Sequence, residues 1–377
     1  MSLKILIAPD SFKESMSASR VAECLKAGIE AALPGVSAIT LPVTDGGEGF
    51  LDAMVNGTEG YVKPVKAHDA LMRSLTAEIG FSADGNTAFI EMARASGLEL
   101  IRTEERNPLI TTTFGTGEMM LSAIRAGCKR IIMGIGGSAT NDGGAGMAQA
   151  LGVRLLDDSD NELPPGGGSL SRLHSIDISG IFPVIPEILV ACDVTNPLTG
   201  NSGASAVYGP QKGATSDLVA TLDWCLAHYA SVVRDKLGKE VENFPGAGAA
   251  GGLGAGLMAF CNANLTSGFR LFADITGLEE KIAATDIIIT GEGKMDSQTL
   301  QGKAPFGVAQ LAVKHGKPVI GVAGTLGKDS EKLYNHGFSL LLSIINKPMS
   351  LEEALKNAPE LVRDTGLRIG KILNIIM

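Results

Sequence analysis

The sequence is poor in aromatic residues, which make up 5% of its 377 positions and include one tryptophan and four tyrosines. So few flat side chains, scattered along the chain, do not suggest a stacking platform for nucleic acid bases. Positive charge is also scarce, since 32 lysines and arginines face 41 acidic residues, for a formal net charge of -9. The sequence therefore lacks the basic footprint of a protein that binds nucleic acid.

Cysteine and histidine are sparse, with five of each. The cysteines are odd in number, widely spaced and form no C-x-x-C pair, so we expect no disulfide framework, no zinc site and a reducing cytoplasm. The histidines show neither H-E-x-x-H spacing nor an obvious Ser/His/Asp order, and we assign them no role. The longest weakly polar run, Gly246 to Cys261, is too short and glycine-rich for a membrane span, and no signal peptide is apparent.

Glycine, by contrast, is abundant, with 48 residues scattered through apolar runs. This pattern argues against collagen or a low-complexity tail and is typical of α/β enzymes with many tight loops. The length is sufficient for two domains, and 45% hydrophobic residues is ordinary for a folded protein.

Five apolar runs have the character of buried parallel strands. Helical patterns separate them, such as Ser17 to Leu33, which Pro34-Gly35 ends. We expect the five runs to form one parallel sheet. They are Lys4 to Pro9, Ala38 to Val43, Asp286 to Thr290, Pro318 to Ala323 and Ser339 to Ile345.

A different pattern interrupts these runs. Apolar residues alternate from Leu75 to Phe81, before the turn Asp84-Gly85-Asn86, and again at Ala88 and Ile90, which indicates an antiparallel hairpin. We therefore predict an α/β fold with a discontinuous parallel-sheet domain and an inserted domain of mixed strands. The first comprises residues 1–66 plus 283–377 and the second residues 67–282, with the active site in the cleft between them.

Three loops that follow predicted strands are rich in polar side chains. They are residues 10–15, 44–49 and 291–297, and the carboxyl ends of parallel strands would bring them to one rim. A single aspartate in such a loop is more often a turn or helix cap, but three coincident loops favour a function. Lysines there could bind phosphate or carboxylate, and carboxylates could hold magnesium or accept a hydroxyl proton. The candidates are Lys13, Lys294, Asp45, Glu48, Glu292 and Asp296.

The stretch Ile135 to Gly146 follows an apolar run and combines five glycines with hydroxyl, amide and carboxylate side chains. Its backbone N–H groups could approach a phosphate closely, and a helix expected from Ala145 to Leu151 would point its N-terminus there. The alternative is a tight turn between a buried strand and a close-packed helix.

Two further segments of the inserted domain have more than one interpretation. Asp193 and Asn196 are metal or substrate candidates, or part of an Asx turn ahead of Pro197. The glycine-rich stretch from Gly246 to Gly256 could form a nest for phosphates or a helix of small residues packed tightly against a neighbour.

No Walker A motif is present, which excludes the usual P-loop kinase. A nicotinamide-dependent oxidoreductase acting on a small hydroxy acid is an alternative, because two segments match the dinucleotide fingerprint by letter. The segment at Gly134, Gly136 and Ala139 continues into polar residues where a helix should run, and the segment at Gly246 lacks a preceding strand. A non-catalytic sensor of a small acid would need only the binding loops.

Several of these segments together resemble the bacterial type I glycerate kinase family. The resemblance implies an α/β fold with a Rossmann-like parallel-sheet domain that carries an inserted α/β domain. It also implies phosphorylation of D-glycerate by ATP with Mg²⁺, 2-phosphoglycerate as product and a setting in sugar-acid catabolism. The matching blocks are Ile7–Ser15, Asp45–Gly49, Ile135–Gly146, Ala191–Leu198, Gly209–Gly213, Pro245–Gly256 and Thr290–Gln298.

On this basis we expect domain closure to bring ATP and glycerate together and to exclude water. The sequence does not rank the carboxylates as base or metal ligand, and it leaves the oligomeric state open, a homo-oligomer included. The expected catalytic residues are Lys13, Asp45, Asp193 and Asp296, of which Asp193 and Asp296 are also the metal candidates. The expected glycerate contacts are Asp10, Ser11, Gly46, Gly47, Glu48 and Asn196, and the expected nucleotide contacts are Gly136, Gly137, Ser138, Thr140, Asn141 and Glu292.

Overall fold

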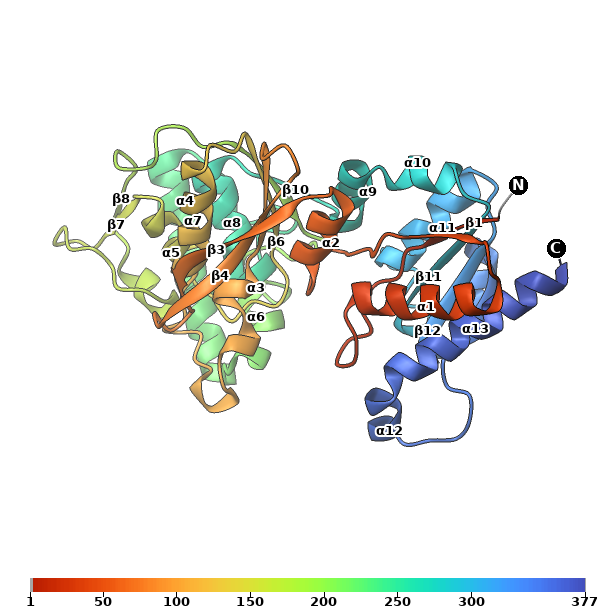
Figure 1. The fold of residues 1–377 in the computed structure, drawn as a ribbon. Helices are drawn as coiled ribbons and strands as arrows, with labels where there is room; N and C mark the ends of the chain where they lie inside the picture. Colours follow the sequence, from red (N-terminus) through yellow and green to blue (C-terminus); the bar gives the residue numbers. More distant parts are fainter. Residues whose placement is uncertain (1–2, 377) are drawn as a thin grey trace. The chain divides into compact units, whose positions relative to one another are not determined.

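A computed structural model describes residues 3–376, which pack as two compact units. The first unit contains the chain up to Asp45, the segment Asp52–Thr58 and the chain from Phe269 onward. The second unit contains Gly46–Leu51 and Glu59–Gly268. Each unit is built on its own sheet (Figure 1).

These bounds correct the boundaries expected at residues 66 and 283. Strand β3 (Tyr61–His68) pairs with β4 (Ser74–Phe81) along its whole length, so residue 66 lies inside a strand of the second unit. Helix α10 (Leu278–Ala283) packs on α11 (Ala304–Lys314), so residue 283 lies inside the first unit. The physical reason is that strand pairing and helix packing set where a unit ends, whereas loop composition is only a guide.

The sheet of the first unit is entirely parallel, as the five apolar runs predicted. Its order is β13-β12-β11-β1-β2. The chain moves from β1 outward to β2, and later from β11 outward to β13, so the strand order reverses between β1 and β11. In open parallel sheets, ligands bind outside the carboxyl ends of the strands at such a switch point. The strands are β1 (Lys4–Ile7), β2 (Ser37–Thr40), β11 (Ile287–Met295), β12 (Val319–Leu326) and β13 (Phe338–Ser343).

Helices cover both faces of this sheet (Figure 1). Helix α1 (Ala18–Ala32) begins where Ser17 accepts a hydrogen bond from the N–H of Arg20, and it packs against α13 (Ala358–Ile376). Both helices share a core with the inward residues of the strands, while α11 lies on the other face. The unit also contains α2 (Phe50–Gly57), which begins in the second unit, α9 (Gly268–Thr276), η5 (Ser330–His336) and α12 (Leu351–Lys356).

The second unit is built on a mixed six-stranded sheet of order β10-β9-β6-β5-β4-β3. Its first four strands are parallel, and β4 and β3 complete it in antiparallel pairing. The predicted hairpin is confirmed, because Gly80 pairs with Phe89 and Phe81 with Ala88. The remaining strands are β5 (Thr87–Glu91), β6 (Arg130–Gly134), β9 (Glu187–Ala191), β10 (Asn264–Thr266) and the separate pair β7 (Arg154–Leu156) and β8 (Ser175–Asp177).

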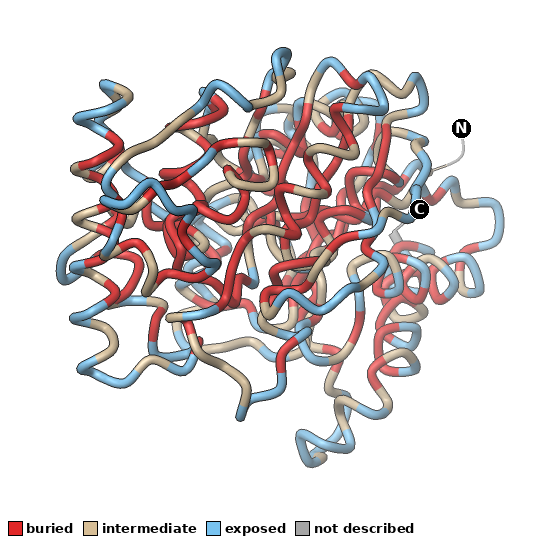
Figure 2. The backbone as a smooth tube through the Cα atoms, turned by 90° about the vertical axis from the view of Figure 1, so that its left-hand side faces the viewer, coloured by how far each residue is buried: buried red, intermediate tan, exposed pale blue. Residues whose placement is uncertain are grey.

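Helices surround this sheet, and one core of buried residues joins the strands to the helices. Figure 2 shows buried stretches of chain inside and exposed stretches mainly at the outer loops and turns. Within the described residues, no helix is long and apolar enough to cross a membrane. The predicted α/β class, with one parallel and one mixed sheet, is confirmed. The helices are α3 (Ala93–Ser96), η1 (Leu98–Leu100), η2 (Thr103–Glu105), α4 (Phe114–Arg125), α5 (Ala145–Ala150), η3 (Gly167–Arg172), α6 (Ala204–Tyr208), η4 (Pro210–Lys212), α7 (Ser216–Leu237) and α8 (Ala249–Cys261).

Replacing Gly28 tests the close packing of α1 on α13. A Cβ atom at Gly28 would clash with the carbonyl oxygen of Arg363. We expect Gly28→Ala to lower the free energy of unfolding by about 1–3 kcal/mol, the usual cost of an overpacked contact. Chemical denaturation measures this, with Ala27→Leu on the exposed side of α1 as the control. Equal stability of Gly28→Ala and the parent protein would contradict the packing.

Candidate active site

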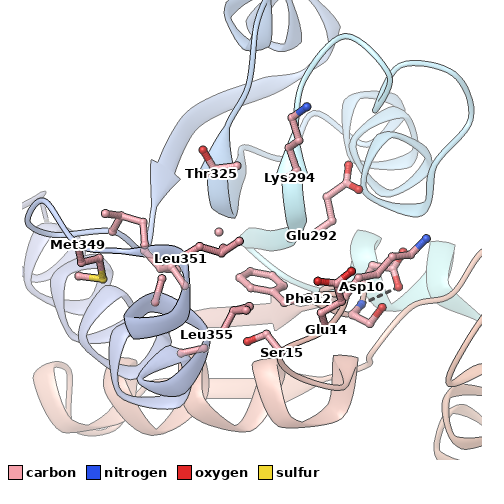
Figure 3. Close-up of a pocket in the computed structure, with 18 of the residues that line it drawn as sticks. Asp10, Phe12, Glu14, Ser15, Glu292, Lys294, Thr325, Met349, Leu351 and Leu355 are labelled. Atoms are coloured by element: carbon pink, nitrogen blue, oxygen red, sulfur yellow. Dashed lines mark hydrogen bonds between the residues drawn. The ribbon is translucent and has the colours of Figure 1, made fainter.

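A cavity of about 610 Å³ opens in the first unit at the carboxyl ends of the strands (Figure 3). One end is charged and lies at the switch point, and the other end is apolar and lies beside α12. The charged end is lined by Asp10, Lys13, Asp45, Glu292, Lys294 and Lys303. The apolar end is lined by Phe12, Ile344, Ile345, Met349, Leu351, Ala354 and Leu355.

Asp10 follows β1 and lines the charged end of the cavity. Its carboxylate accepts a hydrogen bond of 2.7 Å from the N–H of Ser11. Burial raises the pKa of Asp10 to about 8, and the negative charges of Asp45 and Glu292 act in the same direction. The Ser11 hydrogen bond and the charge of Lys13 oppose this rise. A carboxyl group with such a pKa can exchange a proton near neutral pH.

Glu292, on β11, is 7% exposed and held from two sides. Its carboxylate accepts a hydrogen bond of 2.7 Å from Thr299 Oγ1 and forms an ion pair of 2.6 Å with Lys303 Nζ. Lys303 immediately precedes α11, where the helix dipole disfavours a cation. Sequence reasoning missed Lys303, although a lysine at a helix N-terminus was a signal that it has a partner.

Asp296 has a different environment from the carboxylates of the cavity. Its Oδ2 pairs with Lys294 Nζ at 2.9 Å, and its Oδ1 accepts a hydrogen bond from the N–H of Gln298 at 2.8 Å. Hydrogen bonding to Lys294 holds the pKa of Asp296 below its usual value. These contacts keep the Asp296 carboxylate charged and let it stabilise a turn next to the cavity. The catalytic and metal-binding roles of Asp296 stay predictions.

The structure thus gathers one part of the expected site in the first unit. Asp10, Ser11, Lys13, Asp45 and Glu292 all line the cavity, and they come from the loops after β1 and β2 and from β11. The other expected residues, Asp296 aside, lie in the second unit.

In the second unit, the glycines of two loops serve close backbone packing. A Cβ atom at Gly46 would lie 2.7 Å from Ala191 Cβ, and one at Gly136 would lie 2.9 Å from Gly47 Cα. The Gly46-Gly47 turn therefore packs directly on the chain at the carboxyl ends of β6 and β9. This close packing explains why glycine occupies these positions. The neighbouring Glu48 is exposed.

Lys212 organises the loop that was expected to bind nucleotide. Its Nζ donates hydrogen bonds of 2.7 Å to Ser138 Oγ and to the carbonyl oxygen of Thr140, although the residue is only 1% exposed. Burial lowers the pKa of Lys212 to about 7, against the opposing charge of Asp142. Sequence reasoning noted the segment around Lys212 but missed its role, because lysine is almost never fully buried.

Thr140 and Asn141, which belong to this loop, are fully buried. Asn141 Nδ2 donates a hydrogen bond of 3.0 Å to Ser205 Oγ. Thr140 Oγ1 and Asn141 Oδ1 are buried without a hydrogen-bond partner in the described structure. Gly137 has a left-handed φ of 73°, and a Cβ atom there would lie 3.5 Å from Ala93 Cβ, which is an ordinary van der Waals contact. The loop therefore combines internal packing with two unsatisfied polar atoms.

Asp193 and Asn196 follow β9 and bind neighbouring loops. Both carboxylate oxygens of Asp193 accept a hydrogen bond from the N–H of Gly268 at 3.2 Å. Asn196 donates to the carbonyl oxygen of Ser202 and accepts from the Tyr208 hydroxyl, each at 2.7 Å. Among the described residues, no three or more His, Cys, Asp or Glu side chains form a group that could hold a metal by themselves.

Neither of the two segments that match the dinucleotide fingerprint has the strand–turn–helix surroundings of a dinucleotide-binding site. Gly134 ends β6, but the next helix, α5, begins only at Ala145. In the stretch Gly246 to Gly256, a Cβ atom at Gly251 would collide with the carbonyl oxygen of Thr140. The expected close packing is present, but the expected helix is interrupted, because Ala250, Gly251 and Gly252 have left-handed φ values.

Lys212→Met tests the buried ammonium group. Between pH about 7 and its ordinary value of 10.5, the folded state binds fewer protons at Lys212 than the unfolded chain does. Lys212 thus makes the free energy of unfolding rise with pH in this window. We expect Lys212→Met to remove a rise in the free energy of unfolding of about 3–4 kcal/mol between pH 7 and 10, measured by urea denaturation. Lys236→Met, at an exposed lysine of α7, is the control, and an unchanged pH slope in Lys212→Met would contradict the assignment.

Asp10→Asn tests the crowded carboxyl groups, whose effect on the pH dependence of stability is opposite to that of Lys212. Because the folded pKa of Asp10 is raised, the folded state binds more protons than the unfolded chain between pH about 4 and 8. Stability from this group is complete below pH 4 and is lost as the pH rises through 8. We expect the free energy of unfolding of Asp10→Asn, relative to that of the parent protein, to rise by about 3–4 kcal/mol between pH 5 and 8. Exposed Asp364→Asn should show no such gain.

Comparison with known proteins identifies the family. The model of the glycerate kinase family matches residues 5–374. Glycerate 2-kinase of Escherichia coli (strain K12) is 48% identical over 377 residues, covering 100% of this chain and 99% of the relative. Glycerate kinase of Bacillus subtilis (strain 168) is 48% identical over 375 residues, covering 99% and 98%. A crystal structure of a Salmonella typhimurium LT2 protein assigned as glycerate kinase 2 superposes with a TM-score of 0.89 at 48% identity, covering 100% and 99%. The resemblance is confirmed, and the chain belongs to the glycerate kinase family.

Proposed function

We propose that this protein phosphorylates D-glycerate with ATP and that the product is 2-phosphoglycerate. Family membership supports a glycerate kinase, and the relative from Escherichia coli carries the name glycerate 2-kinase. The observation that carries the proposal is the charged end of the cavity, where carboxylates and lysines meet at the switch point of a parallel sheet. Phosphoryl transfer depends on this combination, because cations offset the phosphoryl charge and a carboxylate accepts the hydroxyl proton.

Within this cavity, Lys13 binds an anionic oxygen of glycerate or of the phosphoryl group, and Ser11 and Asp10 contact glycerate. Asp45 is the proposed proton acceptor in the cavity, with Asp193 and Asp296 as the other two candidates. Lys294 and Lys303 also line the cavity, and each pairs with a carboxylate, Asp296 and Glu292 respectively. Gly46, Gly47, Glu48 and Asn196 stay proposed glycerate contacts.

The carboxyl groups of the cavity fit a magnesium ion. Burial raises the pKa of Asp10 and the negative charges of Asp45 and Glu292 add to the rise, so a divalent cation would relieve the repulsion among these groups. Mg²⁺ is usually held by one or two carboxylates together with substrate phosphates, so no all-protein cage is needed. When bound, the ion neutralises charge on the phosphates. Asp193 and Asp296 stay proposed ligands.

Other parts of the sequence-based hypothesis stay proposals. Gly136, Gly137, Ser138, Thr140 and Asn141 are proposed to contact phosphate oxygens, and Glu292 is a further proposed nucleotide contact. Three further predictions concern the setting of the reaction. They are an active site in the cleft between the domains, a cytoplasmic location and a possible homo-oligomer. The oxidoreductase alternative has no support from the context of either fingerprint, and the sensor alternative is an outcome of the activity test.

An ADP-release assay with ATP, Mg²⁺ and D-glycerate tests the function. We expect turnover that requires D-glycerate, with L-glycerate and acid-free reactions as controls, and ³¹P NMR should show phosphate on the 2-hydroxyl. Asp45→Asn should lower kcat by about 100-fold or more, the usual contribution of a general base. Asp364→Asn is the control. No turnover in folded protein would contradict the kinase, and near-normal turnover in Asp45→Asn, Asp193→Asn and Asp296→Asn alike would contradict the site.

A further inference from the structure

The apolar end of the cavity has no use in binding glycerate. Met349, Leu351 and Leu355 line it from the segment that follows β13, and Phe12 lies between them and the charged end (Figure 3). Leu351 is 74% exposed, although it belongs to the lining of a cavity. Glycerate is a small polar acid, so it has no apolar face to cover these side chains and would leave most of the volume empty.

We propose that this apolar end binds the purine base of ATP, with the ribose and phosphates extending toward the lysines of the charged end. The inference rests on the proposed kinase function, since it names where the nucleotide of that reaction binds. A flat, largely apolar base gains free energy by covering aliphatic side chains, and ligand sites are mostly apolar with a few polar groups that fix orientation.

The order of the strands supports this placement. The apolar residues follow β13, whereas Glu292 and Lys294 lie on β11. The two strands are separated by β12, so the ends of the cavity are two strand spacings, roughly 10 Å, apart. This separation is comparable to the reach of a ribose and a diphosphate. A nucleotide lying across the strand ends would therefore occupy both ends of the cavity.

This inference places the base in the first unit, whereas the sequence pointed to nucleotide contacts mainly in the loop Gly136–Asn141. Lys212 and Ser205 already engage the side chains of Ser138 and Asn141 in that loop, so these side chains are not needed to hold the base.

The double variant Leu351→Ser, Leu355→Ser tests the base site. Leu351 is exposed and Leu355 half-buried, so the protein should still fold, which circular dichroism checks. We expect its Kd for ADP, measured by calorimetric titration, to rise at least about tenfold. In turnover, KM for ATP should rise by a similar factor while KM for D-glycerate stays unchanged. Ile372→Ser, at an exposed residue of α13 outside the cavity, is the matched control.

Unchanged ADP affinity and unchanged KM for ATP in the double variant would overturn the base site while leaving the kinase intact. Equal losses for ATP and D-glycerate would also overturn it, because they indicate a general disturbance. Failure of the proposed function has another signature: the parent protein would bind ADP without turning over D-glycerate, and the ADP titration of the variant would still decide where the base binds.

Discussion

Three carboxyl groups brought together at one end of a parallel sheet are the constraint on which the first unit depends. Asp10, Asp45 and Glu292 come from three neighbouring strands or the loops after them, so the sheet cannot form without placing like charges close together. Burial raises the pKa of Asp10, and the like charges of Asp45 and Glu292 add to that rise. Thr299 and Lys303 stabilise the charged form of Glu292 through a hydrogen bond and an ion pair.

The second unit meets a different constraint, the close approach of backbones. Gly46 and Gly136 let a turn pack on the strand ends, and Gly251 lets a helical segment pack on the loop that contains Thr140. Such packing leaves little room for water, so polar groups need partners within the protein. Lys212 is one such partner, and its lowered pKa reflects the desolvation that accompanies the packing.

Much of the fold could be predicted from local patterns. The five apolar runs are the strands of the parallel sheet, the alternation around Asp84-Gly85-Asn86 is a hairpin, and the pattern from Ser17 to Leu33 contains the first helix. That polar residues would gather at one edge was also predictable, since parallel strands end there, but residues 291–295 of the third expected loop continue strand β11. The unit boundaries were displaced, because β3 joins the second sheet through long-range pairing that no local composition signals.

The site was less predictable than the fold. The sequence by itself determined which polar residues follow each strand, and the family resemblance it carries was confirmed over nearly the whole chain. Only the tertiary structure decided that Lys303 pairs with Glu292, that Lys212 is buried, and that Leu351 and Leu355 line the same cavity as Asp10. The physical reason is that strand and helix patterns depend on neighbouring residues, whereas burial, ion pairing and cavity shape depend on residues far apart in the chain.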